Sequence, residues 1–140
     1  MLIGEYQNKL DQKGRLALPA RWRSEFVTGG VVTRGLDGCL FVYTATAWGE
    51  LLARLQQLSV TTAHARALSR HLIAGAIEFQ LDKQGRLLLP LYLRQAVNLT
   101  TECVIAGLVD RLEIWSAGAW QSYQASNQAT VAELAESLTM

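Results

Sequence analysis

Two five-residue segments of this 140-residue sequence place an aspartate and an arginine four residues apart, with a glycine just before the arginine. They are residues 11–15, DQKGR, and residues 82–86, DKQGR. A guanidinium group carries its N–H donors in a planar fork that fits a carboxylate, a phosphate or the edge of a guanine. Each arginine could therefore pair with its own aspartate and brace a turn, or bind an external anion or base. The two roles are compatible, because the aspartate can order the loop while a cation faces outward.

Basic charge is concentrated around these two segments. Over the whole sequence 13 Lys and Arg face 12 Asp and Glu, a formal net charge of +1, which gives no case for non-specific binding to nucleic acids or membranes. Residues 9–23 nevertheless carry a net charge of +4 and residues 82–94 one of +2, so the remainder carries −5. A basic loop at a hairpin tip can reach the phosphates and groove edges of double-stranded DNA. The predicted DNA-contacting residues are Lys9, Gln12, Lys13, Arg15, Arg21, Lys83, Gln84 and Arg86, and the predicted turn-forming residues are Asp11, Gly14, Asp82 and Gly85.

The two segments belong to a tandem repeat. Residues 10–23 (LDQKGRLALPARWR) and 81–94 (LDKQGRLLLPLYLR) share eight of fourteen residues at an offset of 71, and the match resumes at an offset of 72 further along. Such self-similarity is the signature of a duplicated structural unit. The boundaries that we expect are a first repeat at 5–47, a helical connector at 48–75, a second repeat at 76–119 and a C-terminal tail helix at 120–140.

Each repeat is expected to be a β-rich unit of roughly 45 residues. Apolar and polar residues alternate over 77–81, which is the period of a half-buried strand. The DQKG and DKQG sequences suit type I turns, and Pro19 suits the first turn of a helix. Strands at 31–35 and 39–43 are expected to close the unit as a hairpin.

A unit of this size buries too little surface to be stable alone. We therefore expect the two copies to pair strands across a pseudo-two-fold axis, in one interleaved β-structure that presents the two basic tips together. The connector is expected to form two helices, over 48–58 and from Thr61 or Thr62 to Ile73. Residues 131–140 are expected to form a marginal helix with a fraying end.

The rest of the sequence indicates no other chemistry. His64 and His71 lie seven residues apart without a carboxylate or thiol at ligand spacing, so we expect no metal. The glycines form no phosphate-binding motif and no serine lies in a nucleophile elbow, so we expect no cofactor, no small-molecule substrate and no enzymatic activity. Cys39 and Cys103 are expected to be reduced, packed thiols. Without a visible secretory signal or membrane-length apolar run, we expect a cytoplasmic protein.

The duplicated motif in a chain of this length resembles the MraZ family, bacterial proteins encoded at the head of the division and cell-wall gene cluster. The resemblance covers essentially the whole chain. It implies an α+β fold in which two AbrB-like (SpoVT-AbrB) domains form a pseudo-dimeric swapped-hairpin (double-split) β-barrel with flanking helices. It also implies DNA contacts by Arg15 and Arg86, and by Lys13, whose counterpart is Gln84 with Lys83 one place earlier.

The same resemblance implies a sequence-specific transcriptional regulator, usually a repressor of its own operon, that is cytoplasmic and nucleoid-associated. Its targets would be tandem G-rich direct repeats in a promoter. The family assembles into ring homo-oligomers, in which several weak tips would bind spaced repeats together through their effective concentration.

Two other classes of function are alternatives to the hypothesis of a DNA-binding transcriptional regulator. One is a protein-binding module, such as an antitoxin or a regulator that sequesters a partner enzyme, because AbrB-like folds also serve in antitoxins. Those proteins typically carry one copy of the domain and a disordered tail, whereas this chain has two copies and a short tail. The other is an enzyme, which no group of residues in the sequence supports.

Overall fold

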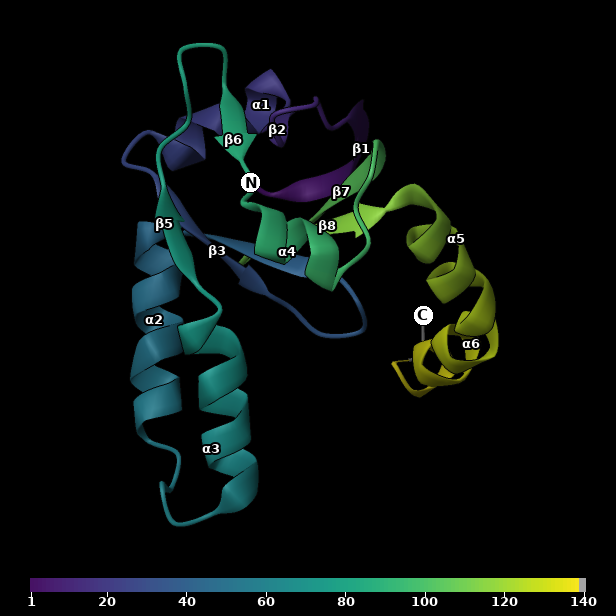
Figure 1. The fold of residues 1–140 in the computed structure, drawn as a ribbon. Coiled ribbons are helices and arrows are strands. Elements are labelled where there is room, and N and C mark those ends of the chain that lie inside the picture. The colour runs from purple at the N-terminus through teal and green to yellow at the C-terminus, as the bar shows by residue number, and fades with distance from the viewer. Residues whose placement is uncertain (139–140) are drawn as a thin grey trace.

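The structure, a computed structural model, describes residues 1–138. The chain folds into a mixed α+β structure with a mostly antiparallel sheet, which confirms the predicted class (Figure 1). The strands are β1 (Ile3–Lys9), β2 (Arg15–Ala17), β3 (Gly30–Arg34), β4 (Leu40–Thr44), β5 (Ile77–Phe79), β6 (Arg86–Leu88), β7 (Glu102–Leu108) and β8 (Leu112–Ser116). The helices are α1 (Ala20–Arg23), α2 (Ala45–Gln56), α3 (Ala63–Ser69), α4 (Leu91–Ala96), α5 (Ala117–Ser126) and α6 (Gln128–Ser137), with a 3₁₀ turn at Ser24–Phe26 and a π turn at Arg70–Ala74.

The strands of the two halves interleave. One sheet has the order β1-β7-β8-β4-β3-β5, and a second, two-stranded sheet pairs β2 with β6. The first strand of each half therefore lies on the hairpin of the other half: β1 pairs with β7 over its whole length, and β5 pairs with β3. Strands β4 and β8 join the two hairpins in the middle of the large sheet. Neither repeat completes its own sheet, as the small size of the unit predicts.

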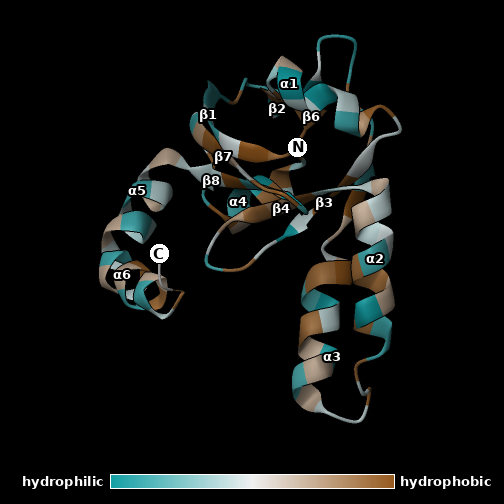
Figure 2. Ribbon diagram, turned by 180° about the vertical axis from the view of Figure 1, so that it is seen from behind, coloured by the Kyte–Doolittle hydropathy of each residue, from teal (hydrophilic) through white to brown (hydrophobic). Residues whose placement is uncertain are grey.

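The same duplicated positions build the main core. Leu16, Leu18 and Trp22 of the first half and Leu87, Leu89 and Leu93 of the second are all fully buried. Because side chains alternate along a strand, burial of Leu16 and Leu87 directs their neighbours Arg15 and Arg86 to the outer face of the β2–β6 pair. A second cluster, around Phe41, Tyr43 and Trp115, lies against the helices that follow β4 and β8. Figure 2 shows mainly hydrophobic residues in the central strands and a mixture of hydrophilic and hydrophobic residues along the helices.

The connector forms two helices whose ends follow from caps. Helix α2 begins at Ala45, three residues before the expected start, because Thr44 Oγ1 accepts a hydrogen bond from the Ala47 N–H at 3.1 Å. Helix α3 follows Thr62, whose hydroxyl accepts from the Ala65 N–H at 3.3 Å. The two helices project from the sheet as an antiparallel pair (Figure 1).

The tail that we expected to be helical over 120–140, with a marginal helix over 131–140, forms two helices, each of which begins three residues before the expected start. Helix α5 begins at Ala117, where Ser116 Oγ caps the Ala119 N–H at 3.2 Å, and the chain turns at Asn127 into α6. Ser116 stands 72 residues after the cap Thr44, so the second repeat reuses the first repeat's helix start. Residues 139 and 140 of the expected tail helix lie outside the described residues.

The helix that follows Pro19 is short. Helix α1 spans only Ala20–Arg23 and tightens at once into the 3₁₀ turn. That turn still buries Phe26, whose ring lies 5.9 Å from that of Phe79. None of the helices in the described part of the chain is long and apolar enough to span a membrane.

Candidate nucleic-acid interface

The first candidate segment, residues 11–15 (tip 1), is a turn braced by its own aspartate. Asp11 Oδ1 accepts from the backbone N–H groups of Lys13 and Arg15, each at 2.9 Å. Asp11 Oδ2 accepts from Arg15 Nε at 2.7 Å. The turn is closed by the Gly14 N–H, which donates to the Asp11 carbonyl at 3.1 Å, and φ of Gly14 is +85°, a conformation that favours glycine.

The second segment, residues 82–86 (tip 2), repeats this network. Asp82 Oδ1 accepts from the N–H groups of Gln84 and Arg86 at 2.9 Å, and Asp82 Oδ2 accepts from Arg86 Nε at 2.7 Å. Gly85 has φ of +73°. The tips therefore agree in their backbone and in the arginine brace, and they differ in their outermost side chains, Gln12-Lys13 against Lys83-Gln84.

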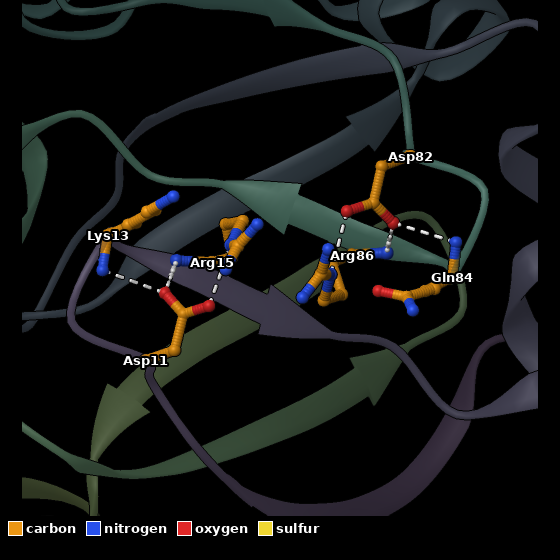
Figure 3. Close-up of polar contacts among 6 residues, drawn as sticks. All are labelled: Asp11, Lys13, Arg15, Asp82, Gln84 and Arg86. Carbon is orange, nitrogen blue, oxygen red and sulfur yellow. Dashed lines mark hydrogen bonds and ion pairs between the residues drawn. The ribbon is translucent and has the colours of Figure 1, made fainter.

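The two braced arginines share one face of the β2–β6 pair. Arg15 lies opposite Leu88 and Arg86 lies opposite Ala17, so both arginines alternate with the inward pair Leu16 and Leu87. Figure 3 shows the tips at opposite ends of this small sheet, with both arginines between the two aspartates. Their side chains are 32% and 28% exposed, so neither is sealed in the core. Each bonds its aspartate through Nε, and among the described residues no hydrogen bond is found for the terminal guanidinium nitrogens of either arginine.

Hydrogen bonding also sets the charge of both aspartates. The pKa of Asp11 lies below its ordinary value, mainly because the Arg15 N–H donates to the carboxylate, and the Arg15 side chain adds to this effect. The pKa of Asp82 is lowered in the same way by Arg86. Both carboxylates are therefore ionised at neutral pH, and each tip keeps its brace.

The other candidate residues do not all gather at the tips. Lys13 and Gln12 are exposed on tip 1, as Lys83 and Gln84 are on tip 2. Lys9, at the end of β1, lies 3.8 Å from Glu102, which offsets part of its charge. Arg21 stacks on Trp22, with its guanidinium carbon 4.7 Å from the ring centre, and it reaches toward Gly4 of β1 rather than toward a tip.

Two further arginines lie directly against the tips. Arg23 packs on Gly85 of tip 2, and Arg94 packs on Gly14 of tip 1. From the sequence, Arg23 and Arg94 were predicted only to add to the basic charge of residues 9–23 and 82–94. The recurrence of arginine at this position, at an offset of 71, was the signal in the sequence that both residues matter. The glycine that each arginine contacts depends on how the strands of the two halves pair.

The structure offers no second site of comparable definition in its described part. No group of three His, Cys, Asp or Glu residues there could hold a metal ion. Cys39 and Cys103 are free and buried, and burial raises the pKa of the first to about 12 and of the second to about 11. His71 Nε2 lies 2.7 Å from the Gly35 carbonyl, and His64 is exposed.

Known proteins resemble the chain along its whole length. A family model described as "MraZ protein, putative antitoxin-like" matches residues 1–71 and again residues 72–139. A relative from Lactiplantibacillus plantarum is 46% identical over 138 residues, covering 99% of this chain and 98% of its own. One from Desulforamulus reducens is 45% identical, covering 99% and 97%. One from Moorella thermoacetica is 47% identical over 123 residues, covering 88% and 86%.

All three relatives bear the name transcriptional regulator MraZ. The class of protein is thus a regulator and not an enzyme, as the sequence predicts. The chain belongs to the MraZ family.

Proposed function

We propose that this protein is a sequence-specific transcriptional regulator that binds double-stranded DNA through tip 1 and tip 2. The observation that carries the proposal is the placement of Arg15 and Arg86 on one outer face, each oriented by an ionised aspartate. An arginine held in this way keeps its terminal N–H donors for phosphate oxygens or for O6 and N7 of guanine. Lys13, Lys83 and the two tip glutamines would extend the contact along the groove.

The finer features of the proposal rest on the family resemblance. The protein would bind tandem G-rich promoter repeats and repress its own division and cell-wall operon, in the cytoplasm at the nucleoid. Residues 5–47 and 76–119 would be the two SpoVT-AbrB-like repeats of one swapped-hairpin barrel, joined by the connector 48–75 and followed by the tail 120–140. The exchange of β1 and β5 between the halves supports such a barrel, and the affinity of arginine for guanine suits G-rich sites.

The test is DNA binding by Arg15→Ala and Arg86→Ala, measured by mobility shift on the protein's own upstream region. Loss of one arginine contact to a base is expected to weaken binding about tenfold or more. The matched control is Arg54→Ala, which removes one exposed cation from α2, away from the tips. Circular dichroism and oligomeric mass are expected to stay unchanged. Normal binding by both tip variants would contradict the proposal.

A ring of subunits is part of the proposal, and two unlike surfaces support it. Val131 and Leu134 of helix α6 are each about two thirds exposed. The sequence from residue 112 to residue 140, which includes this helix, contains no lysine or arginine. A groove of about 340 Å³ between α2 and α3 is lined by apolar residues and by Arg66 and Arg70. Helices α2 and α5 both pack against the cluster around Phe41, Tyr43 and Trp115, and the two helical pairs diverge from there (Figure 1). Contacts between unlike surfaces are head-to-tail, and they close into a ring when the rotation from one subunit to the next closes.

Native mass spectrometry of Leu134→Asp tests this contact. The added charge is expected to shift the protein toward monomers, whereas Val27→Asp, at an exposed valine outside both surfaces, is expected to leave the mass distribution unchanged. An unchanged distribution for Leu134→Asp would remove α6 from the interface.

A protein-binding module is the second candidate, favoured by the antitoxin-like description of the family model and by the same exposed apolar faces. Co-purification with and without nuclease separates the two functions. A protein partner kept after nuclease digestion would favour this candidate, and loss of all partners with the DNA would favour the regulator.

A further inference from the structure

Arg23, the last residue of α1, connects the first repeat to tip 2 of the second. Its Nε–H donates to the Leu18 carbonyl at 2.8 Å, which fixes the plane of the guanidinium group. The Leu18 N–H in turn donates to the Gly85 carbonyl at 3.0 Å. The guanidinium covers Gly85 so closely that a Cβ added there would lie 2.6 Å from Arg23 Cζ. Gly85 is buried for this reason, although it lies in the turn between β5 and β6.

Arg94, in α4, makes the mirrored set of contacts to tip 1 of the first repeat. Its Nε–H donates to the Leu89 carbonyl at 2.9 Å, and the Leu89 N–H donates to the Gly14 carbonyl at 2.8 Å. A Cβ added at Gly14 would lie 2.9 Å from Arg94 Cζ and 2.7 Å from the Leu89 oxygen. Each tip is thus braced from inside by its own aspartate and from beneath by an arginine of the other repeat.

The chemistry of these contacts needs arginine rather than a cation of any shape. The guanidinium must lie flat on a glycine while its Nε donates to a carbonyl, and a lysine ammonium can satisfy only one of these conditions. Neither Arg23 nor Arg94 has a salt bridge to a carboxylate among the described residues. Each arginine therefore has two backbone contacts: a hydrogen bond to a carbonyl of its own repeat and a packing contact on the glycine of the opposite tip.

We propose that Arg23 and Arg94 are crossed positioning residues, each of which holds the DNA-contacting tip of the opposite repeat. Arg23 sets the geometry of Arg86, and Arg94 sets the geometry of Arg15. This inference rests on the proposed function. It adds that each repeat depends on the helix of the other repeat to hold its DNA-contacting tip in place. Supports of this kind fix the orientation of a contacting group without contacting the ligand.

A double-mutant cycle on DNA affinity tests the crossing. Arg23→Ala alone is expected to weaken binding about five- to tenfold, the worth of one lost positioning contact. In an Arg86→Ala background the same change is expected to have less than about a twofold effect, because the group it positions is gone. In an Arg15→Ala background it keeps its full effect. Equal effects in both backgrounds would overturn the proposal.

Two further measurements separate positioning from a direct phosphate contact. Arg23→Lys is expected to bind as weakly as Arg23→Ala, because the charge is kept and the flat contact is lost. Recovery of wild-type affinity by the lysine variant would show that charge alone acts, and would overturn the proposal. The reciprocal variant Arg94→Ala is expected to couple with Arg15→Ala and not with Arg86→Ala.

Amide hydrogen exchange tests the crossed contacts without DNA, so its result stands if the proposed function fails. In Arg23→Ala, the amides of Gln84, Gly85 and Arg86, all bonded to Asp82, are expected to exchange at least about fivefold faster than in the wild type. The amides of Lys13 and Arg15 in tip 1 are expected to keep their rates. Equal acceleration in both tips would show a general loss of stability and overturn the crossing. Unaltered DNA binding by Arg15→Ala and Arg86→Ala would instead count against the proposed function alone.

Discussion

Replacing Gly85 by alanine measures how tightly Arg23 packs on tip 2. At Gly38, between β3 and β4, φ is +88° and no atom lies within 4 Å of an added Cβ, so Gly38→Ala carries only left-handed backbone strain of about 1–2 kcal/mol. At Gly85, with φ of +73°, the new methyl group would also meet the Arg23 guanidinium. Arg23 must then move and lose its bond to the Leu18 carbonyl, a further loss of about 1 kcal/mol.

We therefore expect Gly85→Ala to lower the free energy of unfolding by about 2–3 kcal/mol, against about 1–2 kcal/mol for Gly38→Ala. The effect of alanine on the unfolded chain is the same at both positions and cancels in the comparison. The assay is urea denaturation at one protein concentration, since assembly contributes to stability. In an Arg23→Ala background, Gly85→Ala is expected to lower the free energy of unfolding by no more than Gly38→Ala does. Equal losses at both glycines in the wild-type background would refute the close contact.

Three more predictions concern charge and access. Lys13→Ala is expected to reduce the slope of log K against log[salt] for DNA binding by about one, and an unchanged slope would show that Lys13 contacts no phosphate. Because folding lowers the pKa values of Asp11 and Asp82, their contribution to stability is complete above the ordinary value of 3.8 and is lost as the pH falls through the lowered values. Measurement of the unfolding free energy as the pH is lowered is expected to show this loss. The double variant Asp11→Asn/Asp82→Asn is expected to show a smaller loss. Cys39 and Cys103, with raised pKa values of about 12 and 11, are expected to react with a thiol reagent only after denaturant is added, and rapid labelling of the native protein would contradict their burial.

Local patterns in the sequence predicted the parts of the fold that depend on short-range contacts. The spacing of aspartate, glycine and arginine identified both turns, since all their bonds lie within five residues. The small repeat predicted that the halves would share strands. Helix α5 begins at Ala117 rather than at the expected residue 120, although Ser116 repeats the cap Thr44, because a single Ser or Thr is a weak signal without its backbone geometry.

The contacts of Arg23 and Arg94 could not be predicted in this way. Each arginine lies in the same motif as one tip and packs on the other, 62 residues ahead for Arg23 and 80 behind for Arg94. Only the pairing of β2 with β6 brings these positions together. The motif showed that both residues recur, and the topology decides which glycine each one covers.

The different side chains at the two tips have a consequence for the choice of target. A dimer of identical subunits presents two identical tips, and its two-fold symmetry matches palindromic sites. Here tip 1 and tip 2 belong to one polypeptide, and the order of the glutamine and the lysine is reversed between Gln12-Lys13 and Lys83-Gln84. In the proposed complex with DNA, covalent fusion of two unlike tips would let the protein distinguish the two orientations of a site, and successive molecules would bind head to tail along a run of sites with the same orientation.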